Sequence, residues 1–383
     1  FSESNNATSW STAQPVLKEL PKLIKDRNKL AREAYYRLRY LVPENVTSGY
    51  RFGHMAVFSR FCRANRIPHE VIVGIPRSIS EIKNLAMEDE LSYMIYVKTS
   101  EPFYVSNFNR NAIAGDMETD LQGQEVYFAD GLLPVTGWSL AKRTLPVLPA
   151  QENTVVSDIA LSLTDLDNGT FRIKETKSYT GASREPFQNT FIHGFDFYTE
   201  ELEKYESPKS LAKLKKSSSY KDTMKKYAEY KESKQAKLEE RLLSQVKQDF
   251  EGLEVEKVEN GTIVQMGRYD DQPVFTISFD VTGSGAVKKA GPNYLVDIGK
   301  FIEGQAHIEE EERKRKYNVY MPFARTFRYN VTFDIPEGYE VQGIENLNMS
   351  TENATGGFTS AANIKYGKLH IQTVKFYASN YEK

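Results

Sequence analysis

The chain contains a single cysteine, Cys62, which by residue type is the side chain best suited to act as a nucleophile. A cysteine attacks a carbonyl carbon as the thiolate, and a helix N-terminus or a neighbouring imidazole makes it reactive by lowering its pKa. Cys62 instead shares one face of a predicted helix with Phe58 and Phe61. This position predicts a buried, inert thiol.

The five histidines are scattered singly along the chain, without the spacing typical of metal ligands. His54 lies near the start of a predicted helix. A surface or capping role is the simplest interpretation for it, and a new function near the helix N-terminus stays open. The other four are expected to be structural or exposed: His69, His193, His307 and His370.

Three carboxylates, Asp116, Glu118 and Asp120, occupy alternate positions of a glycine-flanked loop. Calcium loops use oxygen ligands at such a spacing, but the glycine and the terminal glutamate of an EF-hand are absent. We therefore expect a solvated acidic loop. A single cysteine also excludes a disulfide framework and a cysteine-based zinc site, so the sequence predicts no metal and no cofactor.

The elements that position these residues begin with helices. Leucines recur at helical spacing from Pro15 to Leu41, with a restart at Asp26 or Asn28 and an end at Pro43. A second helix is predicted over 53–65. Three strands should follow, over 67–74, 91–97 and 103–106.

From about Gln124 the pattern is that of β-structure. Strands over 159–164 and 170–179 flank Asp167-Asn168-Gly169, a turn signal that requires positive φ. A helical arm begins at Ser207-Pro208, breaks near Ser217–Ser219 and runs to about Phe250. Alternating apolar residues then predict strands over 262–266, 274–281, 327–335 and 368–376.

The bulk properties limit the class of protein. A chain of 383 residues predicts about two to four domains, and its net charge of −2 argues against a general nucleic-acid binder. No apolar run approaches the roughly 18 to 20 residues that cross a bilayer. The start at Phe1 with a polar segment suggests a processed or truncated end, with a signal peptide or an upstream domain out of view.

The segment Phe61-Cys62-Arg63-Ala64-Asn65-Arg66-Ile67-Pro68, followed by two strands, resembles the transglutaminase-like core of the papain-like superfamily. The segments 312–323 and 335–341 look like the C-terminal β-domain of the multidomain transglutaminase-like proteins of Bacteroidetes, a group of domains of unknown function. This resemblance implies an α+β fold: a transglutaminase-like core followed by antiparallel β-sandwich-type domains with a helical insertion.

The same resemblance locates the catalytic positions of the family on this chain. The nucleophile position corresponds to Arg51, the histidine position to Ser92 or Tyr93, and the aspartate position to Ser106 or Asn107. An arginine cannot serve as the nucleophile, so all three catalytic roles are unfilled. The implied protein is a pseudo-enzyme with degenerate positions Arg51, Tyr93 and Ser106. Its expected binding residues are Arg51, His54, Tyr93 and Asn107.

The helical arm is strongly basic. Between Lys209 and Lys247 twelve Lys or Arg stand against five acidic residues, an excess of about +7. One interpretation is an arm that touches an anionic partner such as a lipid surface or an acidic protein. The favoured interpretation is a solvated face of helices packed on the β-domain. Within the arm, Asp222-Thr223-Met224 resembles the acceptor of O-glycosylation in Bacteroidetes.

The sequence thus predicts three domains: a catalytically degenerate core over 1–123, a β-rich domain over 124–310 with its arm at about 207–250, and a C-terminal β-domain over 311–383. The expected function is a binding or structural subunit of a bacterial envelope complex, in the periplasm or at the outer membrane. The expected partners are envelope proteins and no nucleic acid, and a membrane is reached only through a partner or an N-terminal anchor. An alternative is a peptide or glycan that binds in the old cleft, the place where the active site of the related enzymes would lie. A second alternative is a hydrolase or transferase that uses the displaced residues Cys62, His54 or Asp116.

Overall fold

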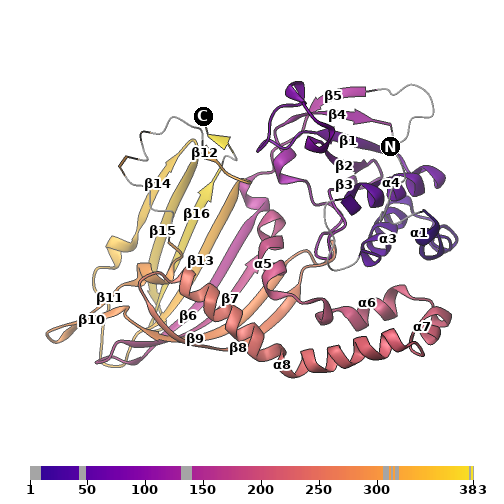
Figure 1. Ribbon diagram of the computed structural model, residues 1–383. Coiled ribbons are helices and arrows are strands. Elements are labelled where there is room, and N and C mark those ends of the chain that lie inside the picture. The colour runs from indigo at the N-terminus through magenta and orange to yellow at the C-terminus, as the bar shows by residue number, and fades with distance from the viewer. Residues whose placement is uncertain are drawn as a thin grey trace. The chain divides into compact units, whose positions relative to one another are not determined.

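The computed structural model describes residues 10–42, 49–130, 140–304, 310–311, 314, 319–378 and 381–382, which form two compact units (Figure 1). Unit 1 comprises Phe1–Leu148, His193–Lys225 and Gly267–Pro273, and unit 2 comprises Pro149–Ile192, Lys226–Met266 and Val274–Lys383. This organisation differs from the three consecutive domains predicted from the sequence, because each unit is assembled from three separated segments. The mixed α+β class agrees with the prediction.

The N-terminal helices of unit 1 follow the predicted leucine pattern. They are α1 (Trp10–Leu17), α2 (Leu20–Leu23), α3 (Arg27–Tyr40) and α4 (Gly49–Ala64). Asp26 caps α3, since its carboxylate accepts a hydrogen bond of 2.8 Å from the Lys29 backbone N–H. The predicted restart at Asp26 is confirmed. Pro43 lies outside the described residues.

An antiparallel sheet of five strands forms the second layer of unit 1, in the order β3-β2-β1-β4-β5. The strands are β1 (His69–Gly74), β2 (Ser92–Val97), β3 (Phe103–Val105), β4 (Glu125–Ala129) and β5 (Leu140–Thr144). The predicted end of the first domain at residue 123 is wrong, because β4 lies beyond it and pairs with β1 in the same sheet. Local composition changes there, but strand pairing across the sheet decides the boundary.

The two faces of this sheet pack against different elements. Val71, Ile95 and Val105 join residues of α3 and α4 in one apolar cluster. Ile72 and Met94 point to the opposite face, where loop residues complete a second cluster: Met117, Leu121 and Leu145. Helix α4 is therefore held on the face that carries the odd-numbered residues of β2.

Unit 2 is built on one sheet of eight strands, in the order β14-β15-β16-β13-β6-β7-β9-β8. The strands are β6 (Thr154–Asp165), β7 (Thr170–Tyr179), β8 (Glu254–Met266), β9 (Phe275–Ser284), β13 (Arg325–Asp334), β14 (Met349–Asn353), β15 (Gly356–Lys365) and β16 (Lys368–Tyr377). Two small sheets pair β10 (Val287–Ala290) with β11 (Asn293–Val296) and β12 (Val319–Tyr320) with β17 (Tyr381–Glu382). The predicted turn between β6 and β7 is confirmed, with Gly169 at a φ of 65°.

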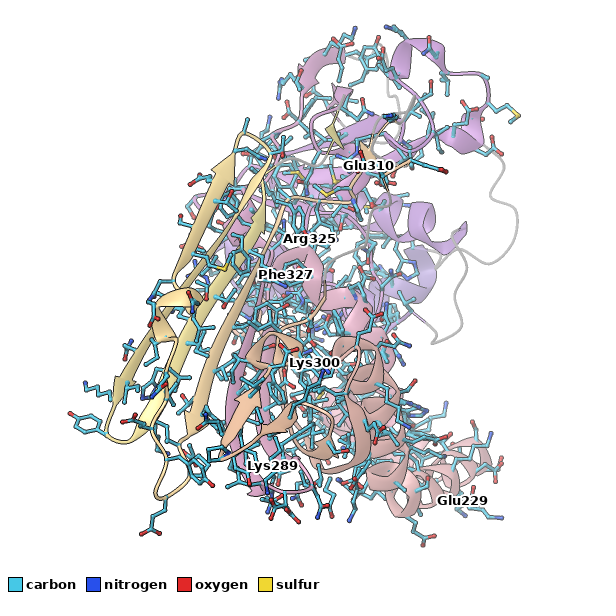
Figure 2. The ribbon with its side chains drawn as sticks, turned by 90° about the vertical axis from the view of Figure 1, so that its left-hand side faces the viewer. Glu229, Lys289, Lys300, Glu310, Arg325 and Phe327 are labelled. Atoms are coloured by element: carbon cyan, nitrogen blue, oxygen red, sulfur yellow. The ribbon has the colours of Figure 1, made fainter. Side chains whose placement is uncertain are left out.

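The predicted β-sandwich is wrong for the described part of unit 2. Helices α5 (Arg184–Phe191) and α8 (Ser218–Asp249) lie on one side of the large sheet (Figures 1 and 2). The other face carries polar side chains that bond across strands, such as Asn330 to Asp158 at 2.8 Å. An alternating pattern of apolar residues predicts that one face of a sheet is covered. It does not predict whether a second sheet or a layer of helices covers that face, because both bury the same apolar side chains. Strand β13 also pairs in parallel with β6, so residues 311–383 are not a separate domain.

The helical arm follows α6 (Tyr198–Tyr205) and has two helices, α7 (Pro208–Leu214) and α8. Ser207 caps α7 through the Ser210 backbone N–H at 3.1 Å, and the predicted break before Ser218 is confirmed. Along α8 the buried residues are Leu238, Leu242 and Val246, all in its C-terminal part. Glu229 points away from the sheet in Figure 2. The prediction that the arm packs on the β-structure therefore holds only for its last turns.

Among the described helices, none combines the length and the apolar character that crossing a bilayer requires.

We expect Leu242→Ala to lower the free energy of unfolding by about 2–5 kcal/mol, because it empties a buried site on α8. Leu242 packs closely on β8, where a Cβ added at Gly261 would lie 2.7 Å from its Cδ1 atom. Urea denaturation followed by circular dichroism measures the change. Met224→Ala, at a half-buried position of the same helix, is the control and should cost less than half as much. Equal losses would contradict the burial described here.

Candidate functional site

Strands β2 and β3 bring two of the predicted catalytic positions together. The last described pair of their ladder is Ile95 with Val105. The same register, continued by two residues on each strand, puts Tyr93 opposite Asn107. Tyr93 packs on the apolar cluster that contains α4, whereas Ser92 alternates to the other face of the sheet. Of the two histidine candidates, Tyr93 is therefore the one that faces the helix.

The first turns of α4 supply the third position. Arg51 lies in this part of α4, but its side chain is outside the described set. His54 is fully buried, and its ring centroid lies 5.5 Å from that of Phe108. The expectation that His54 is a surface or capping residue is wrong, because the chain after β3 covers this turn of the helix.

The residues after β3 form a bonded turn. The Asn107 side-chain oxygen accepts a hydrogen bond of 2.8 Å from the Asn109 backbone N–H, and the Tyr35 hydroxyl donates to the Asn107 carbonyl at 3.1 Å. Ser106 is buried, and its hydroxyl oxygen is 3.4 Å from the Asn107 amide nitrogen. These bonds fix the backbone at the aspartate position with neutral groups.

Tyr93 is half-buried, and burial, followed by the charge of Glu88, raises the pKa of its phenol. It therefore stays protonated at neutral pH. The described side chains of the site are thus a phenol, a hydroxyl, an amide and an imidazole. Such groups can hydrogen-bond a polar ligand, but they provide neither a thiolate nor a carboxylate that orients a catalytic imidazole.

Cys62 lies deeper in α4, in the apolar cluster with Phe58 and Phe61. It is fully buried, and burial raises the pKa of its thiol far above the usual value. A thiol that is neutral and shielded from solvent is a poor nucleophile. The predicted location of Cys62 in the core is confirmed.

A serine–histidine pair that sequence reasoning missed links α4 to β1. The Ser59 Oγ atom lies 2.8 Å from His69 Nε2, and His69 Nδ1 lies 3.0 Å from the Ile67 carbonyl oxygen. Burial lowers the pKa of His69, which favours a neutral ring. The distance suits a nucleophile and its base. Ser59 is only 2% exposed, however, so no substrate reaches its hydroxyl, and the pair joins two elements of the core.

The acidic loop has structural partners of its own. Asp116 accepts a hydrogen bond of 3.0 Å from the Ile113 backbone N–H, and Asp120 accepts one of 2.8 Å from the Ser78 hydroxyl. Within the described ranges no group of three or more His, Cys, Asp or Glu side chains is arranged to hold a metal ion. Neither His193, which accepts from the Phe195 N–H, nor His370, beside Thr332, lies in such a group.

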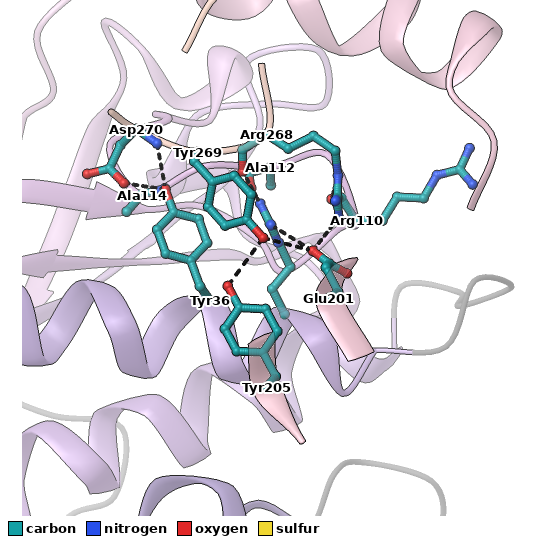
Figure 3. Close-up of polar contacts among 10 residues, drawn as sticks. Tyr36, Arg110, Ala112, Ala114, Glu201, Tyr205, Arg268, Tyr269 and Asp270 are labelled. Atoms are coloured by element: carbon teal, nitrogen blue, oxygen red, sulfur yellow. Dashed lines mark hydrogen bonds and ion pairs between the residues drawn. The ribbon is translucent and has the colours of Figure 1, made fainter. Parts of the chain in front are cut away.

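A buried polar cluster of unit 1, shown in Figure 3, is the second feature that sequence reasoning missed. Glu201 on α6 pairs with Arg39 at 3.2 Å and with Arg268 at 2.8 Å. Burial, followed by the charge of Arg39, lowers the pKa of Arg268 to about 10, although Glu201 opposes this shift. Tyr269 donates a hydrogen bond to Glu201, and Arg268 donates to the Arg110 carbonyl at 2.7 Å.

The same cluster continues through Tyr36 (Figure 3). The Tyr36 hydroxyl donates to the Asp270 carboxylate at 2.5 Å and accepts a hydrogen bond of 2.8 Å from the Asp270 backbone N–H. Arg32 forms an ion pair with the same carboxylate. These contacts tie the segment 267–273 to helix α3, so we assign a structural role to this cluster.

Unit 2 has its own buried charged cluster, centred on Lys177 of β7. Its ammonium group pairs with Asp249, at the end of α8, and with Glu303, and lies 3.8 Å from Glu175. Burial disfavours the charge of Lys177, but the surrounding carboxylates outweigh burial and raise its pKa. Lys375 donates to the Glu303 carbonyl. One cation thus fixes the end of a helix and a loop onto the sheet.

Glu175 is the unusual member of the cluster on Lys177. It is 1% exposed, and burial raises the pKa of its carboxyl group to about 7, against the attraction of Lys177. Asp249 and Glu303 add to the shift through like-charge repulsion. Glu175 is therefore largely protonated below neutral pH and ionises as the pH rises.

Comparisons with known proteins add one family and one distant structure. Residues 296–381 match the family described as "Domain of Unknown Function with solved-structure structure" (DUF3858). No curated protein matches the chain. A crystal structure of a "putative protease" from Parabacteroides distasonis is similar at 8% sequence identity and a TM-score of 0.43, covering 97% of this chain and 50% of that chain. The chain thus spans about half the length of that protein, and a likeness of this degree carries no argument about activity.

The Cys62 thiol should react with an aromatic disulfide reagent more than about a hundredfold more slowly in the native protein than in urea, because reaction must wait for the core to open. Absorbance of the released thiol measures both rates. A Cys62→Ala, Tyr93→Cys variant supplies the control, with an accessible thiol at a half-buried position. Native Cys62 reacting as fast as that control would favour the enzyme alternative.

The Glu175→Gln variant should change how stability depends on pH. A carboxyl whose pKa rises on folding from 4.5 to about 7 contributes stability that is present below pH 4.5 and is lost as the pH rises through 7. Between pH 4 and pH 8 the parent should therefore lose on the order of 3 kcal/mol of stability relative to the variant, which has no carboxyl group to ionise at this position. Urea midpoints from pH 4 to 8 test this, with the exposed Glu256→Gln as the control. Parallel curves for Glu175→Gln and the parent would contradict it.

Proposed function

We propose that this protein is a non-catalytic relative of the transglutaminase-like proteins that serves as a binding or structural subunit of a bacterial envelope complex. The observation that supports this most strongly is which residue types occupy the site at α4. The resemblance puts the histidine position at Ser92 or Tyr93 and the aspartate position at Ser106 or Asn107, none of which is a histidine or an aspartate. The one thiol of the chain is buried in the core.

The architecture around these positions supports a retained scaffold. Helix α4 packs on an antiparallel sheet, and the residue positions of the family's catalytic groups fall on α4, β2 and the chain after β3. Chemistry of the cysteine-protease type requires a thiolate, an imidazole and a carboxylate together. The described site instead offers neutral hydrogen-bonding groups, which suit recognition of a peptide or a glycan.

The proposed location in the envelope rests on the likeness to other proteins and not on the geometry of the site. The match of residues 296–381 to a domain of unknown function and the distant likeness to a Parabacteroides protein agree with the resemblance to Bacteroidetes proteins. That resemblance is the reason for proposing the periplasm or the outer membrane, and partners among envelope proteins.

Affinity purification from detergent-solubilised envelopes of the source bacterium tests the proposal. We expect the tagged chain to retain a stoichiometric partner. If the partner binds at the α4 site, a Tyr93→Ala, Asn107→Ala variant should lose it. Mass spectrometry of the eluates measures retention. Tyr96→Ala is the matched control, because Tyr96 lies on the opposite face of the same strand, and it should keep the partner.

Each outcome has a distinct meaning. A partner that both variants retain would identify a complex subunit and exclude the cleft as its binding surface. Turnover of a peptide or glycan by the wild-type chain that is lost in Cys62→Ala would overturn the non-catalytic assignment.

A further inference from the structure

The hairpin of α7 and the first two turns of α8, residues 207–225, concentrates positive charge. It contains six lysines, one acidic residue and no arginine, a net charge of +5 within a chain whose total is −2. We call this segment the lysine hairpin. Its lysines are Lys209, Lys213, Lys215, Lys216, Lys221 and Lys225.

The lysine hairpin exposes its charge to solvent. All six lysines are exposed, and none forms an ion pair with another described residue. The buried cations of the chain behave differently, since Arg39, Arg268 and Lys177 are each paired with carboxylates. The six ammonium groups are therefore not engaged in holding the fold together.

The hairpin backbone is nevertheless well defined. Ser207 caps α7, and the Ser217 hydroxyl accepts from the Tyr220 backbone N–H at 3.2 Å and donates to the Leu214 carbonyl at 2.7 Å. The apolar side chains of the segment are half-buried: Leu211, Leu214, Tyr220 and Met224. These side chains recur at spacings of three to six residues. These apolar side chains are thus partly covered, whereas the lysine side chains extend into solvent.

We propose that the lysine hairpin docks on the surface of an anionic phospholipid bilayer. Exposed lysines near such a surface are attracted by its negative potential, and the attraction adds up over several lysines. The unpaired charge of +5 complements that surface. The docking is peripheral, which agrees with the finding that no described helix has the character needed to cross a bilayer.

The choice of lysine favours a membrane over a nucleic acid or an acidic protein. Arginine is the usual residue for bidentate recognition of single phosphates and carboxylates, whereas lysine is a hydrated point charge without fixed geometry. A segment with six lysines and no arginine suits a partner whose charge is spread over a plane. This inference concerns a different surface from the α4 site, and it holds or fails independently of the proposed function.

The test is co-sedimentation of the full chain with vesicles of phosphatidylglycerol and phosphatidylcholine, compared with vesicles of phosphatidylcholine alone. We expect binding only to the anionic vesicles, with a loss as salt is raised, because salt screens exposed charges. A variant with Lys215, Lys216, Lys221 and Lys225 each changed to Gln should lose at least about tenfold in partition coefficient.

A matched variant removes the same charge elsewhere. Lys18, Lys174, Lys288 and Lys365 are also exposed, and their joint change to Gln should leave vesicle binding within about twofold of the wild type. Equal urea midpoints for both variants show that folding is intact. Unchanged binding by the hairpin variant, equal losses in both variants, or no binding by the wild type would each overturn the proposal. Tighter binding to a DNA duplex than to anionic vesicles would also overturn it and assign the hairpin to nucleic acid.

Discussion

Charge that is removed from water has to be paired, and this requirement acts at the centre of both units. In unit 1 Glu201 holds two arginines, and Arg268 brings the segment 267–273 with it. In unit 2 Lys177 holds the end of α8 and the loop that contains Glu303. In each unit, leaving one partner of these sets unpaired would place an isolated charge in an apolar interior. The ion pairs therefore select which distant segments lie together, whereas apolar burial supplies most of the stability.

The packing around α4 depends on apolar side chains. Apolar contacts between α4 and the odd-numbered residues of β2 require only that these positions stay apolar and of similar size. Tyr93 packs against the edge of this cluster, and Asn107 lies in the turn that follows β3. His54 lies in the core beside Phe108, and Cys62 lies in the apolar cluster that also contains Phe58 and Phe61. Packing thus accounts for the burial of both side chains.

The α4 site and the lysine hairpin differ in chemistry. The described side chains of the α4 site are buried or half-buried, and Asn107 and Ser106 are hydrogen-bonded within it. The lysines of the lysine hairpin are exposed, the segment carries a net charge of +5, and none of these lysines forms an ion pair with another described residue. The first suits recognition of a shaped ligand, and the second suits attraction to an extended charged surface.

Features that depend on neighbouring residues were predictable from the sequence. Asp26 and Ser207 cap helices, Gly169 permits the hairpin turn, and Cys62 is buried because it shares a helical face with Phe58 and Phe61. Each follows from backbone hydrogen bonding or from the period of one element. The excess of lysine in the arm and the solvated face of its helices were equally visible.

Tertiary structure decided the features that join distant residues. The parallel pairing of β13 with β6 merges two predicted domains into one sheet, and the pairing of β4 with β1 moves the boundary of the other unit. Arg39 meets Glu201 across 162 residues, Lys177 meets Glu303 across 126, and the chain after β3 buries His54. Periodicity and capping contain no information about which elements become neighbours, because that choice depends on the packing of the whole unit.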